Sequence, residues 1–235
     1  MTLRADVLMA GASGLVGGRA LPLLLRRASR EGFRVLAPVR RPLGVHHPAL
    51  GEVETPLAGE ADLAPVEAAI ADAALSVGSF VCALGTTLRD AGSRDAFSRV
   101  DRDLVLDMAL LARRHGARQA VVVSSVGADP ASSNFYLSVK GDLEAGLLAI
   151  GFQRVDLLHP GLLLGPRSRR RPLERIGQWV LPLLSPLMAG PLGRYRPISA
   201  DVVAAALVAL TGRQGQGVHI HNNGAMHELA RGGAA

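Results

Sequence analysis

One tyrosine and one lysine have residue types and a spacing that suit proton transfer. Lys140 is the only lysine among 26 basic residues, and it follows Tyr136 by four positions. Residues four apart share a face of a helix, and lysine supplies a compact ammonium that the planar fork of arginine does not. We therefore expect Lys140 to lower the pKa of the Tyr136 phenol, which prepares the phenol for acid–base catalysis. The alternative is a solvent-facing lysine on a surface helix.

Two serines extend this set of catalytic candidates. Ser124 and Ser125 follow a run of β-branched residues that predicts a buried strand over 119–123. Ser125 is the candidate for hydrogen bonding a substrate carbonyl oxygen and positioning it. Ser124 is its alternate, because the sequence does not show which hydroxyl enters the site. The alternative for the pair is turn chemistry at the end of a strand.

A glycine-rich turn follows the first predicted strand, over 6–10. It consists of Gly11, Ala12, Ser13, Gly14, Leu15, Val16 and Gly17. Glycines allow a tight turn and let the backbone approach a pyrophosphate, which then meets the free N–H groups of a helix beginning near Leu15. We interpret the segment as a dinucleotide-binding loop. The alternative is an ordinary strand-to-helix turn in a glycine-rich chain.

The end of the second predicted strand, over 34–39, indicates which dinucleotide is bound. An acidic residue there would bind the adenosine ribose of NAD, whereas an arginine accommodates the 2′-phosphate of NADP. This chain has Arg40 and Arg41 at that place and no Asp or Glu between residues 34 and 50. The pattern favours NADP(H) as the cofactor. The alternative is a solvated basic loop.

The composition is typical of one α/β domain. Of the 235 residues, 49% are apolar but only 3% are aromatic, so leucine, valine and alanine must fill the core. We assign residues 1–235 to a single domain. The one cysteine, Cys82, excludes an intramolecular disulfide and fits a reducing compartment.

Several classes of protein are not expected. The segment 1–9 contains Arg4 and Asp6 and is typical of a first strand rather than of a signal peptide. The apolar stretch 179–188 contains two prolines and is shorter than the ~20 residues that cross a bilayer. The net charge is +6, but the arginines are scattered apart from 167–171, and few aromatics are present to stack on bases. We expect a cytoplasmic monomer or homodimer that binds no nucleic acid.

Strand and helix patterns alternate along the chain. Strands are predicted over 6–10, 34–39, 53–57, 79–84 and 119–123, and helices over 15–30, 63–74, 95–115 and around Tyr136 and Lys140. This rhythm predicts an α/β fold, a doubly wound parallel sheet of the Rossmann type, with a small substrate-capping segment at 160–200. Ser199 is the expected N-cap of a late helix. His219 and His221 share a face of a predicted strand, but no third ligand is evident and no metal site is expected.

Further motifs occur in the same order as in one known family. They are Gly85-Thr86-Thr87, Arg99-Val100-Asp101-Arg102-Asp103, Gly127-Ala128-Asp129 after the serine pair, Ser132-Ser133-Asn134, Val139-Lys140-Gly141 and Pro160-Gly161 before three leucines. With the glycine turn and the Tyr–Lys pair, these residues resemble the short-chain dehydrogenase/reductase superfamily. They are most similar to its atypical members, which are related to the HIV Tat-interactive protein.

The resemblance implies a Rossmann fold and bound NADPH. It adds Leu84, Gly85, Thr86, Pro160 and Gly161 to the expected cofactor contacts, and it implies that Lys140 also binds the nicotinamide ribose. His159 stands where the family pattern has an arginine before Pro-Gly.

The residues are compatible with two functions. The first is an NADPH-dependent oxidoreductase that acts on a small carbonyl-type substrate. The second is a non-catalytic NADP(H)-binding regulatory or sensor protein. Residues 179–187 are expected to form an apolar lid over the nicotinamide, and the arginines of 167–171 either bind an anionic substrate or face water.

Overall fold

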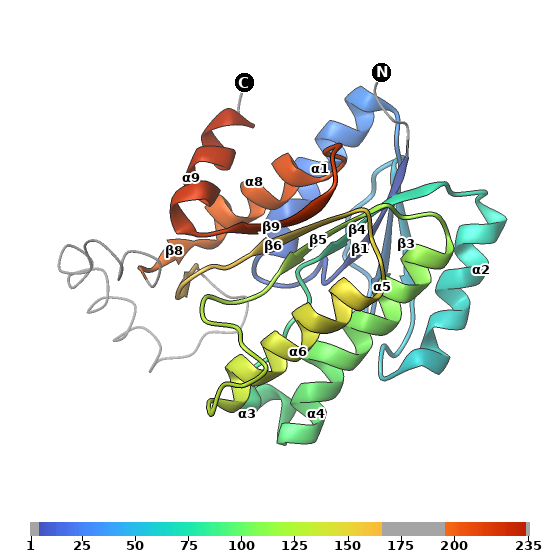
Figure 1. Cartoon of the computed structure of the whole chain (residues 1–235). Helices are drawn as coiled ribbons and strands as arrows, with labels where there is room; N and C mark the ends of the chain where they lie inside the picture. Colours follow the sequence, from blue (N-terminus) through green and yellow to red (C-terminus); the bar gives the residue numbers. More distant parts are fainter. Residues whose placement is uncertain (1–4, 166–195, 234–235) are drawn as a thin grey trace.

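A seven-stranded parallel sheet forms the centre of the computed structural model, which describes residues 5–165 and 196–233 (Figure 1). The strand order is β3-β2-β1-β4-β5-β6-β9, and every neighbouring pair is parallel. The strands are β1 Asp6–Ala10, β2 Val35–Val39, β3 Leu50–Glu54, β4 Val77–Cys82, β5 Gln119–Val123, β6 Arg154–Leu158 and β9 Gly217–His221. The first six strands have the order of a Rossmann fold, so the predicted fold class is confirmed.

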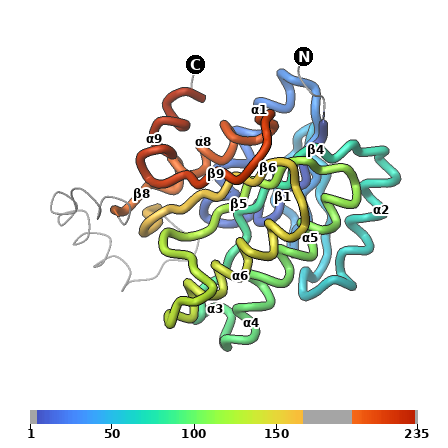
Figure 2. Tube along the Cα trace, viewed as in Figure 1, coloured from blue at the N-terminus to red at the C-terminus, as the bar shows by residue number. Residues whose placement is uncertain are grey.

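Helices cover both faces of the sheet. On one face lie α1 Gly17–Glu31, α8 Ala200–Leu210 and α9 Asn223–Gly232; on the other lie α2 Ala64–Asp72, α5 Leu104–Arg114 and α6 Phe135–Ala149. Figure 2 shows α5 and α6 running side by side along the second face. Shorter elements are η1 Glu60–Leu63, α3 Leu88–Ala91, α4 Arg94–Ser98, η2 Arg99–Asp103 and a small parallel pair, β7 Leu163–Leu164 and β8 Ile198–Ser199.

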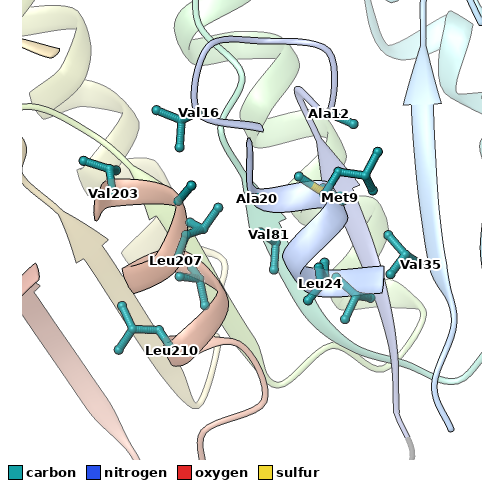
Figure 3. Packing of buried hydrophobic residues seen from close by; sticks show 14 of the residues in the cluster. Met9, Ala12, Val16, Ala20, Leu24, Val35, Val81, Val203, Leu207 and Leu210 are labelled. Atoms are coloured by element: carbon teal, nitrogen blue, oxygen red, sulfur yellow. The ribbon is translucent and has the colours of Figure 1, made fainter. Parts of the chain in front are cut away.

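The core is divided into two apolar layers because a parallel sheet is buried on both faces. In the first layer, Met9 and Val81 of the sheet pack against Leu24 of α1 and Leu207 of α8 (Figure 3). Aliphatic residues recur at helical spacing on the buried side of α1, which attaches this helix to the sheet. Both layers are built from aliphatic residues with few aromatics, as the composition predicts.

Some predicted boundaries are wrong. The third strand is 50–54 rather than 53–57, because Leu50 lies opposite Val35 and all five of its residues pair with β2. The predicted helix over 95–115 is divided into α4, η2 and α5, and η2 is a π-helical turn. The first long helix begins at Gly17, two residues later than expected. Ser199 does cap α8, since its hydroxyl accepts a hydrogen bond from the Asp201 N–H at 3.2 Å.

A buried carboxylate ties the last strands of the sheet together. Asp156 on β6 is fully buried and accepts hydrogen bonds from Arg154, Gln119 and His221. Burial alone would raise the pKa of Asp156, but these three donors outweigh it and lower the pKa to about 2. His221 thus joins β9 to β6 through Asp156. His219 contacts the Gln216 carbonyl at 3.2 Å.

Two expected features, the arginine cluster 167–171 and the lid 179–187, lie outside the described residues. None of the described helices is both long enough and apolar enough to cross a membrane.

Candidate functional site

The candidate residues gather along the carboxyl edge of the sheet. Each segment follows a different strand: residues 11–17 follow β1, Arg40 and Arg41 follow β2, Leu84–Thr86 follow β4, Ser124 and Ser125 follow β5, and Pro160 and Gly161 follow β6. The chain order reverses between β1 and β4, and doubly wound sheets bind ligands outside their carboxyl ends at such a switch point. The fold therefore brings all the predicted site segments to one edge.

The glycine turn leaves the start of α1 open to an anion. Gly11 adopts a φ of 81°, and a Cβ there would lie 2.4 Å from the backbone nitrogen of Leu84. The first turn of α1 has no acidic residue, and its N-cap residue, Val16, makes no side-chain capping bond. No carboxylate of this first turn thus offsets the positive end of the helix dipole. This geometry fits the pyrophosphate of a dinucleotide.

Adding one methyl group to this turn is expected to disrupt it. A Cβ at Gly17 would lie 2.0 Å from the Gly11 carbonyl oxygen, whereas a Cβ at Gly18 would lie 3.7 Å from its nearest neighbour. We predict that Gly17→Ala lowers the free energy of unfolding by at least about 2 kcal/mol. The matched variant Gly18→Ala should leave it unchanged or raise it by up to about 1 kcal/mol. Denaturant titration of both variants measures the difference, and equal stabilities would contradict the close packing at Gly17.

Helix α6 carries the predicted acid–base pair. It begins after Asn134, whose side-chain oxygen accepts a hydrogen bond from the Leu137 N–H at 3.2 Å. Tyr136 lies in the first turn and is 36% exposed, with its ring tilted against that of buried Phe97 at a centroid distance of 5.9 Å. The phenol therefore lies at the protein surface, where a substrate could reach it.

Lys140 is buried and paired with a carboxylate that was not predicted as a site residue. Its Nζ lies 2.7 Å from Oδ1 of Asp101, and the two residues are 4% and 1% exposed. The other oxygen of Asp101 accepts a hydrogen bond from the Thr86 N–H at 2.7 Å. Asp101 lies in η2, and thus connects the lysine to the loop after β4. The reading of Lys140 as a solvent-facing residue is excluded.

The sequence did contain a signal for Asp101. It lies four residues after Phe97 and three before Leu104, which places a carboxylate among apolar positions of one helical face. A carboxylate on a buried face needs a partner of opposite charge. The pattern thus signals a buried, paired carboxylate, but it does not say which cation the carboxylate meets.

The charges around Lys140 keep it protonated. Burial alone would lower the pKa of Lys140, but Asp101, followed by the Tyr136 phenol, raises it above its ordinary value. Close by, burial raises the pKa of the Cys82 thiol to about 12, although the Lys140 charge works in the opposite direction. The site thus contains a fixed ammonium and an unreactive thiol.

The two serines have different environments. The Ser124 hydroxyl donates a hydrogen bond to the carboxylate of Glu144 on α6. The same carboxylate contacts Nε2 of His159 at 2.8 Å. Within the part of the chain that the structure describes, the Ser125 hydroxyl contacts only the carbonyl of its neighbour Val126, at a long 3.3 Å. Ser124 is therefore occupied by a structural contact, and Ser125 is the freer of the two. The histidine that replaces the expected arginine still pairs with a carboxylate.

The second strand ends beside a shallow depression. Arg40 and Arg41 are both exposed and follow Val39 directly. Val39 pairs with Glu54 of β3, and both line a depression of about 330 Å³. A carboxylate thus lies near this end of the sheet even though β2 itself supplies none. Sequence reasoning missed Glu54 because the pairing of β2 with β3 brings it there.

Curated proteins that match the chain define its family. No family model matches it. "Protein FMP52, mitochondrial" of Eremothecium gossypii is 33% identical over 211 residues, covering 87% of this chain and 88% of that protein. The protein of that name from Lodderomyces elongisporus is 30% identical over 202 residues, covering 80% and 84%. "Protein HTATIP2" of Rattus norvegicus is 46% identical over 99 residues, which span 42% of this chain and 39% of the rat protein.

Solved structures agree on the fold. The Bordetella bronchiseptica enzyme WbmH, in complex with NAD⁺, has a TM-score of 0.66 at 19% identity, covering 97% of this chain and 79% of that one. MoeE5, in complex with UDP-glucose and NAD, has a TM-score of 0.65 at 17% identity, covering 93% and 75%. The fold is that of nicotinamide-dinucleotide-binding short-chain dehydrogenases/reductases. The chain belongs to the atypical family of this superfamily that contains FMP52 and HTATIP2.

The expected cytoplasmic location is wrong. The FMP52 relatives from several fungi are named as mitochondrial proteins. The cytoplasmic expectation depended on a single cysteine and a strand-like first segment. A cysteine count reports the absence of a disulfide and says nothing about which reducing compartment holds the protein.

Proposed function

We propose that the protein is an NADPH-dependent oxidoreductase that reduces a small carbonyl compound. The observation that carries the proposal is the buried Lys140–Asp101 ion pair, whose lysine follows the exposed Tyr136 by four positions on α6. A protein that only binds the cofactor needs no buried ammonium beside a phenol. The pair is costly to bury, which favours a chemical role for it.

The cofactor assignment depends on the two ends of the crevice. The open N-terminus of α1 and the glycine turn suit the pyrophosphate. Arg40 and Arg41 suit the 2′-phosphate of NADPH. Lys140 and the Leu84–Thr86 loop, which are joined through Asp101, lie on the nicotinamide side of the switch point.

Each side chain has one role in the proposed reaction. When bound, the cofactor supplies the hydride. Tyr136 donates the proton to the substrate oxygen, and Lys140 keeps a positive charge beside the phenol. Asp101 holds the lysine ammonium in place. Ser125 donates a hydrogen bond to the substrate carbonyl oxygen and orients it.

Cofactor preference tests the proposal. We expect NADPH to bind at least about tenfold more tightly than NADH in calorimetric titrations, because a guanidinium–phosphate contact contributes about 1.5–3 kcal/mol. Arg40→Ala should weaken NADPH binding and leave NADH binding unchanged, with a smaller effect at high salt. Arg118→Ala removes an exposed arginine that precedes β5, at the opposite edge of the sheet, and serves as the control.

Three outcomes would contradict the proposal. Equal affinity for NADPH and NADH would remove the assignment of Arg40 and Arg41 to the 2′-phosphate. Weaker NADH binding in Glu54→Gln would assign the ribose to Glu54 and make NAD the cofactor. Tight NADPH binding without oxidation of NADPH by any of a panel of small aldehydes and ketones would favour the sensor function instead.

A further inference from the structure

Arg196 lies at the carboxyl edge of the sheet with a rigidly held backbone. Its carbonyl accepts a hydrogen bond from the Asn223 side chain at 2.6 Å, and the same side chain accepts one from the Gly161 N–H at 3.1 Å. Asn223 is buried, and it thus fastens Arg196 to the loop that follows β6. Pro197 comes next in the chain and restricts residue 196 to extended conformations.

Among the described residues, the partly buried guanidinium of Arg196 lacks a hydrogen-bond partner at one of its nitrogens. Its Nε is buried and has no hydrogen-bond partner, the one such side-chain atom among the described residues. No ion pair in the described part of the chain includes it. By contrast, Arg154 on β6 contacts Asp156 at 2.7 Å. A buried N–H without a partner is costly, which points to a group that none of the described residues supplies.

The position separates Arg196 from the phosphate groups of the cofactor. The pyrophosphate site follows β1, and the 2′-phosphate site follows β2. The loop held by Asn223 follows β6, three strand positions beyond β1, which is roughly 14 Å at about 4.8 Å per strand. Arg196 is therefore on the substrate side of the crevice.

We propose that Arg196 binds an anionic group of the substrate, either a carboxylate or a phosphate. The planar guanidinium fork matches the paired oxygens of both groups. This inference rests on the proposed function, which makes this part of the sheet edge a substrate site. It restricts the carbonyl substrate to acidic compounds.

Anion binding tests the inference without a known substrate. Succinate and inorganic phosphate are titrated separately by calorimetry into the protein, with and without NADP⁺. We expect one of them to bind and Arg196→Gln to weaken it about tenfold or more. Arg231→Gln removes an exposed arginine on α9 and should change nothing. Arg196→Lys keeps the positive charge but not the planar fork, so its anion affinity should fall between those of the wild type and Arg196→Gln. This variant still tests the inference if Arg196→Gln does not fold.

Matched pairs of aldehydes, with and without an anionic group, test the inference through their KM values. Succinic semialdehyde and butanal have the same carbon chain and differ by one carboxylate, and glyceraldehyde 3-phosphate is compared with glyceraldehyde in the same way. We expect the charged member of one pair to have the lower KM, and Arg196→Gln to remove that difference. Binding of neither anion, or equal binding by wild type and Arg196→Gln, overturns the inference. Failure of NADP⁺ to bind overturns the proposed function instead, because the anion titrations without cofactor still report on Arg196.

Discussion

Replacing Asp101 with alanine is expected to lower the free energy of unfolding by about 3–5 kcal/mol, the usual cost of leaving one member of a buried ion pair alone. Lys140 would lose its counter-charge in a site where it is only 4% exposed, and burial would then lower its pKa. The Thr86 N–H would also lose its acceptor, which lies 2.7 Å away in the native protein. Denaturant unfolding at neutral pH gives the difference in free energy directly.

Two further variants separate this loss from a general effect of removing an aspartate. Asp103 belongs to the same π-helical turn but pairs with Arg102 at the surface, where the two side chains are 44% and 34% exposed. Asp103→Ala should cost less than about 1 kcal/mol. The double variant Asp101→Leu/Lys140→Met removes both charges and should recover most of the lost stability. A single Asp101→Ala variant as stable as Asp103→Ala would show that the buried pair is not what holds Lys140.

The fold was predictable because its signals are local. The central strands are short apolar runs between turn residues, and β5 was placed at its correct bounds from Gln119–Val123 alone. The glycine turn and the Tyr136/Lys140 spacing needed only neighbouring residues. In a parallel sheet the carboxyl ends of all the strands lie at one edge. The meeting of the site segments there could therefore be predicted without knowing their contacts.

The partners of these residues were not predictable in the same way. The pairing of Lys140 with Asp101 depends on how η2 packs against α6, and helical periodicity identifies a buried face without saying what it meets. The contact between Ser124 and Glu144 likewise joins a strand end to the middle of a helix. Glu144 follows Lys140 by four positions, so the sequence predicts that both lie on the same face of α6. It does not predict which residues Glu144 contacts.

Exchanging Lys140 for arginine is expected to abolish turnover although the net charge is unchanged. Nζ of Lys140 lies 2.7 Å from Oδ1 of Asp101, and the lysine is only 4% exposed, so the larger guanidinium has no room without displacing its neighbours. It also cannot place a compact charge beside both the phenol and the ribose hydroxyls. We expect Lys140→Arg to weaken NADPH binding as well as catalysis. Arg102→Lys, the reverse exchange at a partly exposed position, is the control and should be nearly neutral.

Tyr136→Phe should separate catalysis from binding. The ring is 36% exposed and keeps its contact with Phe97 when the hydroxyl is removed, so the change in stability should stay within about 0.5 kcal/mol. Loss of the proton donor should lower kcat by about 10²–10⁴-fold while calorimetry gives an unchanged NADPH affinity. Oxidation of NADPH with a fixed aldehyde measures the first effect. Should both Tyr136→Phe and Lys140→Arg turn over like the parent, the pair is structural, and NADP(H) binding without catalysis becomes the better account of this site.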